Sequence, residues 1–266
     1  MKPSKLSLNL FTLVISLTMT ISSAAAFAKA PSKQFYELIV YHLKNKGQVE
    51  RTDQYLRDAY LPAVHRAGIK TAGVFKNVNI DTAADKKIYV LLTFSSLNEF
   101  HQLTQSLNND KELATKGSDY LEAAFDHAPY SRKETILMEA FAVMPVLKKP
   151  DFTNPKSERI YELRSYEGAT ENLYRNKVRM FNEGKETEIF KRIGSQAVFY
   201  AEVLAGSRMP NLMYMTSYSD MKSREEHWKT FGNDPEWKRL SGLPEYQHNV
   251  SKADIDFLSP TDYSDL

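Results

Sequence analysis

The sequence predicts an α+β protein made of two tandem ferredoxin-like units, each with the element order β-α-β-β-α-β. Three observations lead to this prediction. A strand-like segment occurs twice, each copy is followed by the same order of helical and strand-like segments, and a proline-containing linker separates the copies. The chain has 266 residues, of which 42% are hydrophobic and 26% charged, an ordinary balance for a globular protein of one or two domains.

The first half of the chain recurs in the second half at a nearly constant offset. The sequence "YEL" at 36–38 recurs at 161–163, an Arg-x-Gly at 66–68 recurs at 192–194, "IYVLLTFSS" meets "LMYMTSYSD", and "NDKEL" meets "NDPEW". One short match could arise by chance. Four matches in the same order at a nearly fixed offset indicate an internal duplication.

Each copy begins with an alternating strand rich in Tyr, Ile and Val, followed by a stretch with apolar residues at helical spacing. Gly68 and Gly194 stand where the first helix should end, because glycine adopts the left-handed cap conformation at low cost. The later elements are expected at Thr71–Val78, Ile88–Phe94, Leu97–Leu107 and Thr135–Val143 in the first copy, and at Gln196–Leu204, Leu212–Tyr218, Met221–Phe231 and Ile255–Leu258 in the second.

In a ferredoxin-like unit both helices cover one face of a four-stranded antiparallel sheet. The other face would expose an apolar patch unless something covers it. We therefore expect the two copies to pack sheet to sheet, either within one chain or with copies from a second chain in a homodimer. The predicted domains are residues 31–144 and 158–266, joined by the linker 145–157.

The N-terminus predicts an export signal. Lys2 and Lys5 precede an apolar run from Leu8 to Ile21, and the small-residue pattern Ala26-Phe27-Ala28 follows it, with Ala28-Lys29-Ala30 as a second candidate cleavage pattern. The run is short for a bilayer span of roughly 20 residues, so cleavage after residue 28 is favoured over an uncleaved anchor. We expect residues 1–28 to be a signal peptide and the mature protein to be secreted, into the periplasm or the medium, without a membrane span.

Composition excludes several classes of function. The 35 basic and 33 acidic residues leave a formal charge of +2, which gives no argument for nucleic-acid binding. The absence of cysteine excludes disulfides, thiol catalysis and cysteine-ligated metal. Because the six histidines lack metal-ligand spacing, and the sequence has neither a glycine-rich phosphate loop nor a Gly-x-Ser-x-Gly motif, we predict no metal and no cofactor.

Three segments of the second copy resemble the NIPSNAP family: "IYELRSY" at its start, "WKTFGNDPEW" from Trp228 to Trp237, and the closing "FLSPTDYSDL". The first copy resembles the family less, since Thr104 and Leu113 stand in place of the two tryptophans. The resemblance implies a fold of the dimeric α/β-barrel group and no established reaction. Wider relatives in that group include cofactor-free oxygenases, haem-handling enzymes and isomerases.

The best candidate site residues lie on the strand that opens the second copy. Glu162, Arg164 and Tyr166 share one strand face, and we expect this face to line the barrel interior. A Glu–Arg pair there could leave donors for a carboxylate or enolate ligand, or could be only an internal salt bridge. The first copy retains Glu37 and Tyr41, also candidates, but has no arginine between them.

His65 is the sixth candidate, because a histidine near the end of the first helix could approach the lumen. These residues support three hypotheses. The first is an exported NIPSNAP-domain protein that binds a small molecule or a protein partner. The second is a cofactor-independent barrel enzyme of the oxygenase or isomerase type, and the third is haem binding beside His65. The sequence assigns no catalytic residue.

Overall fold

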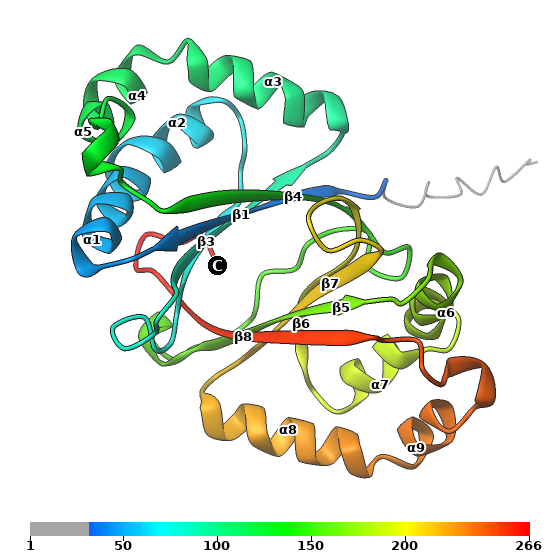
Figure 1. The fold of residues 1–266 in the computed structure, drawn as a ribbon. Helices are drawn as coiled ribbons and strands as arrows, with labels where there is room; N and C mark the ends of the chain where they lie inside the picture. Colours follow the sequence, from blue (N-terminus) through cyan, green and yellow to red (C-terminus); the bar gives the residue numbers. More distant parts are fainter. Residues whose placement is uncertain (1–31) are drawn as a thin grey trace, which may run out of the picture. The chain divides into compact units, whose positions relative to one another are not determined.

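The strand-like segments that repeat in the sequence form one sheet that closes on itself. In the computed structural model, which describes residues 32–266, eight strands pair in an antiparallel manner around a barrel (Figure 1). The predicted signal peptide lies outside the described residues. The two halves contribute four strands each, so the predicted α+β class with a barrel of ferredoxin-like units is confirmed.

The first half has the predicted β-α-β-β-α-β order with extra short helices. Its elements are β1 (Phe35–Leu43), α1 (Lys46–Tyr55), a π-helical turn (Leu56–Tyr60), α2 (Leu61–Arg66), β2 (Ala72–Asn77), β3 (Lys86–Phe94), α3 (Leu97–Asn108), α4 (Lys111–Lys116), α5 (Ser118–Leu121), a 3-10 turn (Phe125–His127) and β4 (Arg132–Ala140).

The second half repeats this order after an irregular linker that ends in a 3-10 turn (Lys156–Glu158). Its elements are β5 (Ile160–Glu167), α6 (Glu171–Asn182), α7 (Glu186–Arg192), β6 (Gln196–Ala205), β7 (Asn211–Tyr218), α8 (Met221–Asn233), α9 (Pro235–Ser241), a 3-10 turn (Pro244–Tyr246) and β8 (Lys252–Pro260). In Figure 1 the helices of each half cover the outside of their own strands.

Two seams join the halves. Around the barrel the strands run β1-β3-β2-β8-β5-β7-β6-β4, so β2 meets β8 and β4 meets β6. Phe75 on β2 pairs with Pro260, and Ala140 on β4 pairs with Ala201. The sheet therefore closes within one chain and needs no second copy to cover it, while association of two such barrels stays a prediction.

The barrel lumen is a packed apolar core. Inward-facing side chains of both halves meet there, with Tyr36 5.3 Å from Phe199 and Phe75 4.8 Å from Tyr161 between ring centroids. Barrels of about eight strands have an interior just wide enough for side chains to fill. The helices bury two further cores on the outside of the sheet, one in each half.

Local signals in the sequence explain where most helices begin and end. Gly68 and Gly194 have φ angles of 99° and 83°, as their predicted left-handed role requires. Asp220 and Asp234 cap the N-termini of α8 and α9 with side-chain hydrogen bonds. Among residues 32–266, no helix combines the length and the apolar character that a bilayer crossing requires.

The last strand of each half differs from its predicted range. β4 begins and ends three residues before the predicted segment, and β8 extends beyond both ends of its prediction. Both strands begin with charged residues such as Lys133 and Asp254. Because these side chains lie at the rim of the barrel, where they remain partly exposed, they interrupt the apolar pattern without ending the strand.

A packed lumen predicts a large cost for removing one of its rings. The substitution Phe199→Ala should lower the free energy of unfolding by about 3–5 kcal/mol, because it deletes a fully buried ring and leaves a void. The matched control is Phe125→Ala, whose ring is 97% exposed and should change stability by no more than about 0.5 kcal/mol. Urea denaturation of the two variants measures both effects, and equal effects would contradict a filled lumen.

Candidate functional site

The strand β5 places its alternating side chains opposite to the prediction. Tyr161 and Leu163 belong to the lumen core, whereas Glu162, Arg164 and Tyr166 face the helices α6 and α8. The expectation that these three residues line the barrel interior is therefore wrong. The physical reason is that Arg224 on α8 meets the carboxylate of Glu162, while the lumen is built from the apolar face.

Glu162 is fully buried and accepts hydrogen bonds from three side chains. Its Oε1 accepts from Arg164 Nε at 2.5 Å, and Arg224 donates to both oxygens at 2.8 and 3.1 Å. The indole Nε1 of Trp228 donates to Oε2 at 2.8 Å. A buried carboxylate is stable only when its charge is paired and its lone pairs are satisfied, and both conditions hold here.

Arg164 extends this cluster toward the tyrosines of the sheet. Its guanidinium lies 3.7 Å from the ring centroid of Trp228, and Nη1 donates to the hydroxyl of Tyr166 at 2.8 Å. The Tyr166 hydroxyl is in turn 2.9 Å from that of Tyr214. The geometry favours the internal salt bridge over ligand binding, because the acceptors of Glu162 are already occupied and Trp228 fills the space above it.

A second buried ion pair closes the same region. Lys177 on α6 donates to Glu186 on α7 at 2.8 Å, and its ammonium lies 4.7 Å from the ring centroid of Phe181. Burial raises the pKa of the Glu186 carboxyl, and the charge of Lys177 offsets part of this effect. The space around Glu162 and Glu186, between the sheet and the helices of the second half, is thus filled by paired charges and aromatic rings.

The first half repeats the buried carboxylate without its partners. Glu37 on β1 is the counterpart of Glu162 and is only 9% exposed. Ile39 stands in place of Arg164, Phe100 in place of Arg224, and Thr104 in place of Trp228. Two of the three corresponding side chains beside Glu37 are therefore apolar, and the third, Thr104, is polar but shorter than Trp228.

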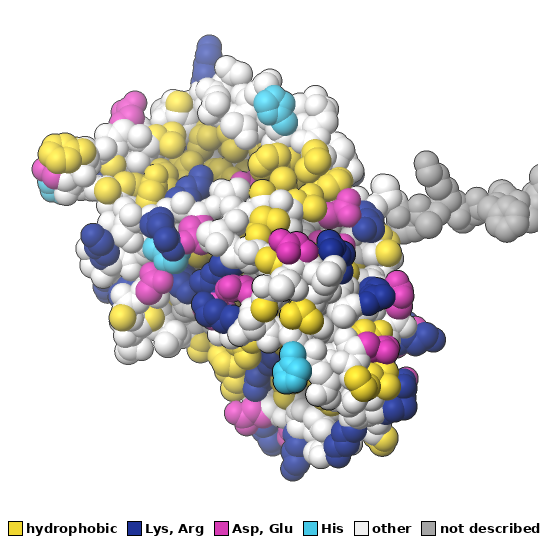
Figure 2. All heavy atoms as spheres, turned by 45° about the vertical axis from the view of Figure 1, so that its right-hand side comes forward, with side chains coloured by type: hydrophobic (Ala, Val, Ile, Leu, Met, Phe, Trp, Pro, Cys, Tyr) yellow, Lys and Arg dark blue, Asp and Glu magenta, His cyan; other side chains and the backbone are white. Residues whose placement is uncertain are grey.

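The smaller side chain of Thr104 leaves a cavity between the sheet and the helices. Its volume is about 360 Å³. Figure 2 shows hydrophobic side chains gathered in a hollow on the upper part of the molecule, the half that carries α1 to α5. The lining comes from β1, α1, the π-helical turn, α3, α4, α5 and β4: Glu37, Ile39, Tyr55, Tyr60, Leu103, Thr104, Leu107, Asn108, Leu113, Ala114, Leu121 and Lys133.

Burial controls the protonation of the polar groups in this cavity. It raises the pKa of the Glu37 carboxyl above its ordinary value, and the charge of Lys133 offsets part of the shift. Burial also raises the pKa of the Tyr55 hydroxyl to about 12. The carboxyl of Glu37 therefore holds a proton to a higher pH than an exposed glutamate, which suits hydrogen bonding to a neutral group.

Tyrosines form the aromatic wall of the cavity and the layer behind it. Tyr55 stacks on Tyr120 at a centroid separation of 3.8 Å and lies 5.8 Å from Tyr60. The predicted candidate Tyr41 is buried behind Glu37 on the same strand face, 6.0 Å from Tyr130. Tyr60 belongs to the π-helical turn. This backbone form is rare in proteins, and where it occurs it is often at a functional site.

His65 lies at the end of α2 and outside this cavity. Its Nδ1 is 2.8 Å from the carbonyl oxygen of Ile69, and Nε2 is 3.5 Å from Asp265. Both ring nitrogens have partners, so the geometry lends no support to the prediction that His65 binds a ligand or a haem iron.

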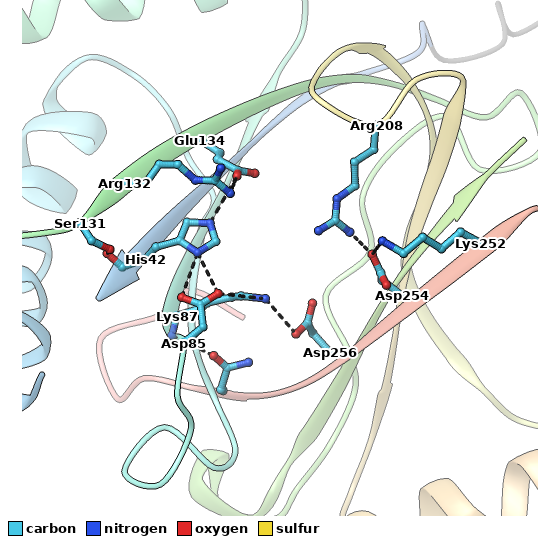
Figure 3. Close-up of polar contacts among 11 residues, drawn as sticks. His42, Asp85, Lys87, Ser131, Arg132, Glu134, Arg208, Lys252, Asp254 and Asp256 are labelled. Atoms are coloured by element: carbon cyan, nitrogen blue, oxygen red, sulfur yellow. Dashed lines mark hydrogen bonds and ion pairs between the residues drawn. The ribbon is translucent and has the colours of Figure 1, made fainter. Parts of the chain in front are cut away.

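A ring of charged residues lies at one end of the barrel (Figure 3). His42 lies 2.9 Å from Asp85 and 3.4 Å from Glu134, while Lys87 spans Asp85 and Asp256 at 3.8 and 3.7 Å. The cavity below this ring is about 40 Å³. That volume admits a few water molecules at most and no organic ligand, so this cluster closes the lumen.

Sequence reasoning found Glu37 and Tyr41 but missed Tyr55, Tyr60 and Lys133. The substitution of Trp228 by Thr104 was visible in the repeat, and it marks the place where the cavity opens. The tyrosines carried no separate signal, because aromatic residues at helical spacing also fill ordinary cores. Arg224 was missed because a charged residue near a helix start usually faces solvent.

Comparison with known proteins finds a family match in the second half of the chain and a fold shared with solved structures. Residues 161–265 match the NIPSNAP family model, and among curated proteins none matches the sequence. A candidate monooxygenase from Fusobacterium nucleatum has a TM-score of 0.57 at 8% identity over 86% of this chain and 93% of its own. A candidate monooxygenase from Lactobacillus acidophilus has a TM-score of 0.54 at 10% identity, over 86% of this chain and 94% of its own. A NIPSNAP family protein from Agrobacterium tumefaciens has a TM-score of 0.36 at 21% identity, over 41% of this chain and 99% of its own. The first two likenesses show the same α/β-barrel fold.

The two buried glutamates should respond differently to the same substitution. Glu162→Gln should lower the free energy of unfolding by about 3–5 kcal/mol, because Arg164 and Arg224 lose their charge partner inside the protein. Glu37→Gln should change it by less than about 1 kcal/mol, because none of those donors is present. Urea denaturation at neutral pH measures both.

The pH dependence of the same variants gives an independent check. A raised carboxyl pKa means that the folded state binds the proton more tightly, so stability falls as pH rises through the folded-state pKa of Glu37. Glu37→Gln removes this loss. The free energy of unfolding of the variant should therefore rise relative to that of the wild type as pH increases above about 4.3, the ordinary glutamate pKa. Parallel pH profiles would contradict a buried, unpaired Glu37.

Proposed function

We propose that this chain, whose residues 161–265 form a NIPSNAP domain within an α/β barrel, binds a small organic molecule in the cavity of its first half. The observation that carries the proposal is a buried carboxyl, Glu37, that faces open space where its duplicate, Glu162, is fully paired. A buried polar group without partners costs free energy, and a ligand that bonds to it would recover that cost.

The lining indicates the chemical class of the ligand. Pockets of roughly 300–1,000 Å³ hold drug-sized molecules, and this one measures about 360 Å³. Its walls are aromatic and aliphatic, with Tyr55 and Tyr60 on one side and the leucines of α3 and α4 on the other. These features fit a flat apolar ligand with one hydroxyl or carbonyl group that bonds to Glu37.

The names of other proteins with this fold agree with such a ligand. Besides the two candidate monooxygenases, an anthrone oxidase-like protein has a TM-score of 0.54 at 7% identity over 87% of this chain. Flat aromatic ketones and phenols are of the class that the cavity would accommodate.

A cofactor-independent enzyme is the second candidate, and the position of Glu37 favours it. A carboxyl whose pKa is raised by burial is a stronger base when ionised than an exposed glutamate, and it can act as a general base. In such a step Glu37 would take a proton from an activated C–H or O–H of the ligand, and the negative charge left on the ligand would face Lys133. Binding without turnover would leave the first proposal standing.

We also propose that the protein is exported, because the first 28 residues have the three regions of a signal peptide. The protein recovered outside the cytoplasm should have lost residues 1–28, as N-terminal sequencing would show. Full-length chains held in the membrane fraction would support an uncleaved anchor instead.

Ligand binding can be tested with a matched pair of probes, 1-naphthol and naphthalene, which differ by one hydroxyl. In calorimetric titration the wild type should prefer 1-naphthol by roughly tenfold, equivalent to about one net hydrogen bond. Glu37→Leu should abolish this preference, because it removes the acceptor and keeps the apolar volume. Thr104→Trp should abolish binding of both probes, because it places an indole where Trp228 fills the second half.

The control for added bulk is Thr230→Trp on the exposed face of α8, which should bind both probes as wild type does. Circular dichroism establishes that each variant is folded. Unchanged binding in folded Thr104→Trp protein would overturn the assignment of the site to this cavity.

A further inference from the structure

A second hollow lies in the other half of the molecule, between α7 and the segment that leaves β4. Its volume is about 470 Å³. The segment after β4 supplies Val143, Met144 and two adjacent lysines, α7 supplies Lys191, and the start of β6 forms the floor. It shares no residue with the first-half cavity, so an inference about it is independent of the proposed function.

Three lysines line this hollow. Within the described range 32–266, Lys148, Lys149 and Lys191 form no ion pair, whereas the one acidic residue of the lining, Glu188, lies 3.8 Å from Lys185 outside it. The lining therefore carries a net positive charge in a protein whose overall charge is only +2. Such a local excess attracts an anion.

The floor of the hollow combines carbon surface with a few polar groups, namely Ser195, Gln196 and the hydroxyl of Tyr200. Met144, Ala197 and Tyr200 present carbon surface, and Ser195 lies among them with only 9% of its surface exposed. The Ser195 Oγ has no hydrogen-bond partner within residues 32–266. This oxygen is closed to solvent, and because a buried hydroxyl is normally hydrogen-bonded, it would donate to an acceptor of the ligand once the side chains over it move aside.

We propose that this hollow binds a small organic anion, with a carboxylate, sulfonate or phosphate head on an apolar body. The head would lie among the three lysines and accept a hydrogen bond from Ser195, and the body would cover Met144, Ala197 and Tyr200. The three lysines, the hydroxyl and the apolar surface each have one role in this arrangement. A purely inorganic anion would leave the apolar floor uncovered, and an apolar molecule would leave the charges and the hydroxyl unused.

The test uses two fluorescent probes with the same ring system, the sulfonate 8-anilinonaphthalene-1-sulfonate and its neutral analogue N-phenyl-1-naphthylamine. The triple variant Lys148→Gln, Lys149→Gln, Lys191→Gln should bind the sulfonate at least about tenfold more weakly, since each lysine contributes a few-fold through screened attraction. Binding of the neutral probe should not change. Ser195→Ala should weaken the sulfonate alone.

The matched control removes three exposed lysines elsewhere: Lys70→Gln, Lys111→Gln and Lys229→Gln. It changes the net charge equally and should bind the sulfonate as wild type does. Wild-type affinity should also fall as salt rises from low to physiological concentration, because screening acts on exposed charges. Equal weakening by the two triple variants would overturn the proposal, since only net charge would then matter.

The first-half cavity must be separated from this hollow, because it too could accept the probes. The titrations are therefore repeated in Thr104→Trp protein, where sulfonate binding should persist and still depend on the three lysines. Loss of sulfonate binding in Thr104→Trp protein, with no effect of the lysine variants, would overturn this proposal and support the other site. Competition by inorganic phosphate as strong as by decanoate, or binding only to anionic lipid vesicles, would also overturn it.

Discussion

Closure of the sheet is the constraint on which the rest of the structure depends. Eight antiparallel strands that meet at two seams leave no free edge and enclose an interior that side chains fill. Because side chains occupy the lumen, the two cavities described above lie outside it, against the helices and the segment that follows β4. The barrel thus acts as a rigid support, and the chemistry depends on how each helical layer fits against it.

The two halves solve the same local problem in different ways. Both place a glutamate on the outer face of their first strand, where burial disfavours its charged form. In the second half Arg164, Arg224 and Trp228 satisfy the carboxylate and fill the space around it. In the first half Ile39, Phe100 and Thr104 do neither, so Glu37 keeps a raised pKa and an open cavity. One buried carboxylate has become part of the framework, while the other remains available.

The repeat in the sequence predicts the topology well, because the order of elements follows from strand and helix periodicity within each copy. Alternation along β5 separates Glu162, Arg164 and Tyr166 from Tyr161 and Leu163, but it cannot say which set faces the helices. That choice depends on donors from α8, more than fifty residues away, and on the packing of lumen rings from both halves. The cavity beside Glu37 depends on the volumes of the side chains around it, and the periodicity of the sequence does not give these volumes. The sequence shows two traces of it, since Thr104 and Leu113, which stand in place of Trp228 and Trp237, both line the cavity.

Joining both seams in one chain also changes what substitution can achieve. In a barrel assembled from two identical chains, every replacement occurs twice, so exchanging a tryptophan for a threonine would hollow both halves and remove a donor from both carboxylates. In this chain the two positions are encoded separately. One half can therefore lose packing and gain a cavity. The other half keeps its buried ion pairs and the stability that they contribute.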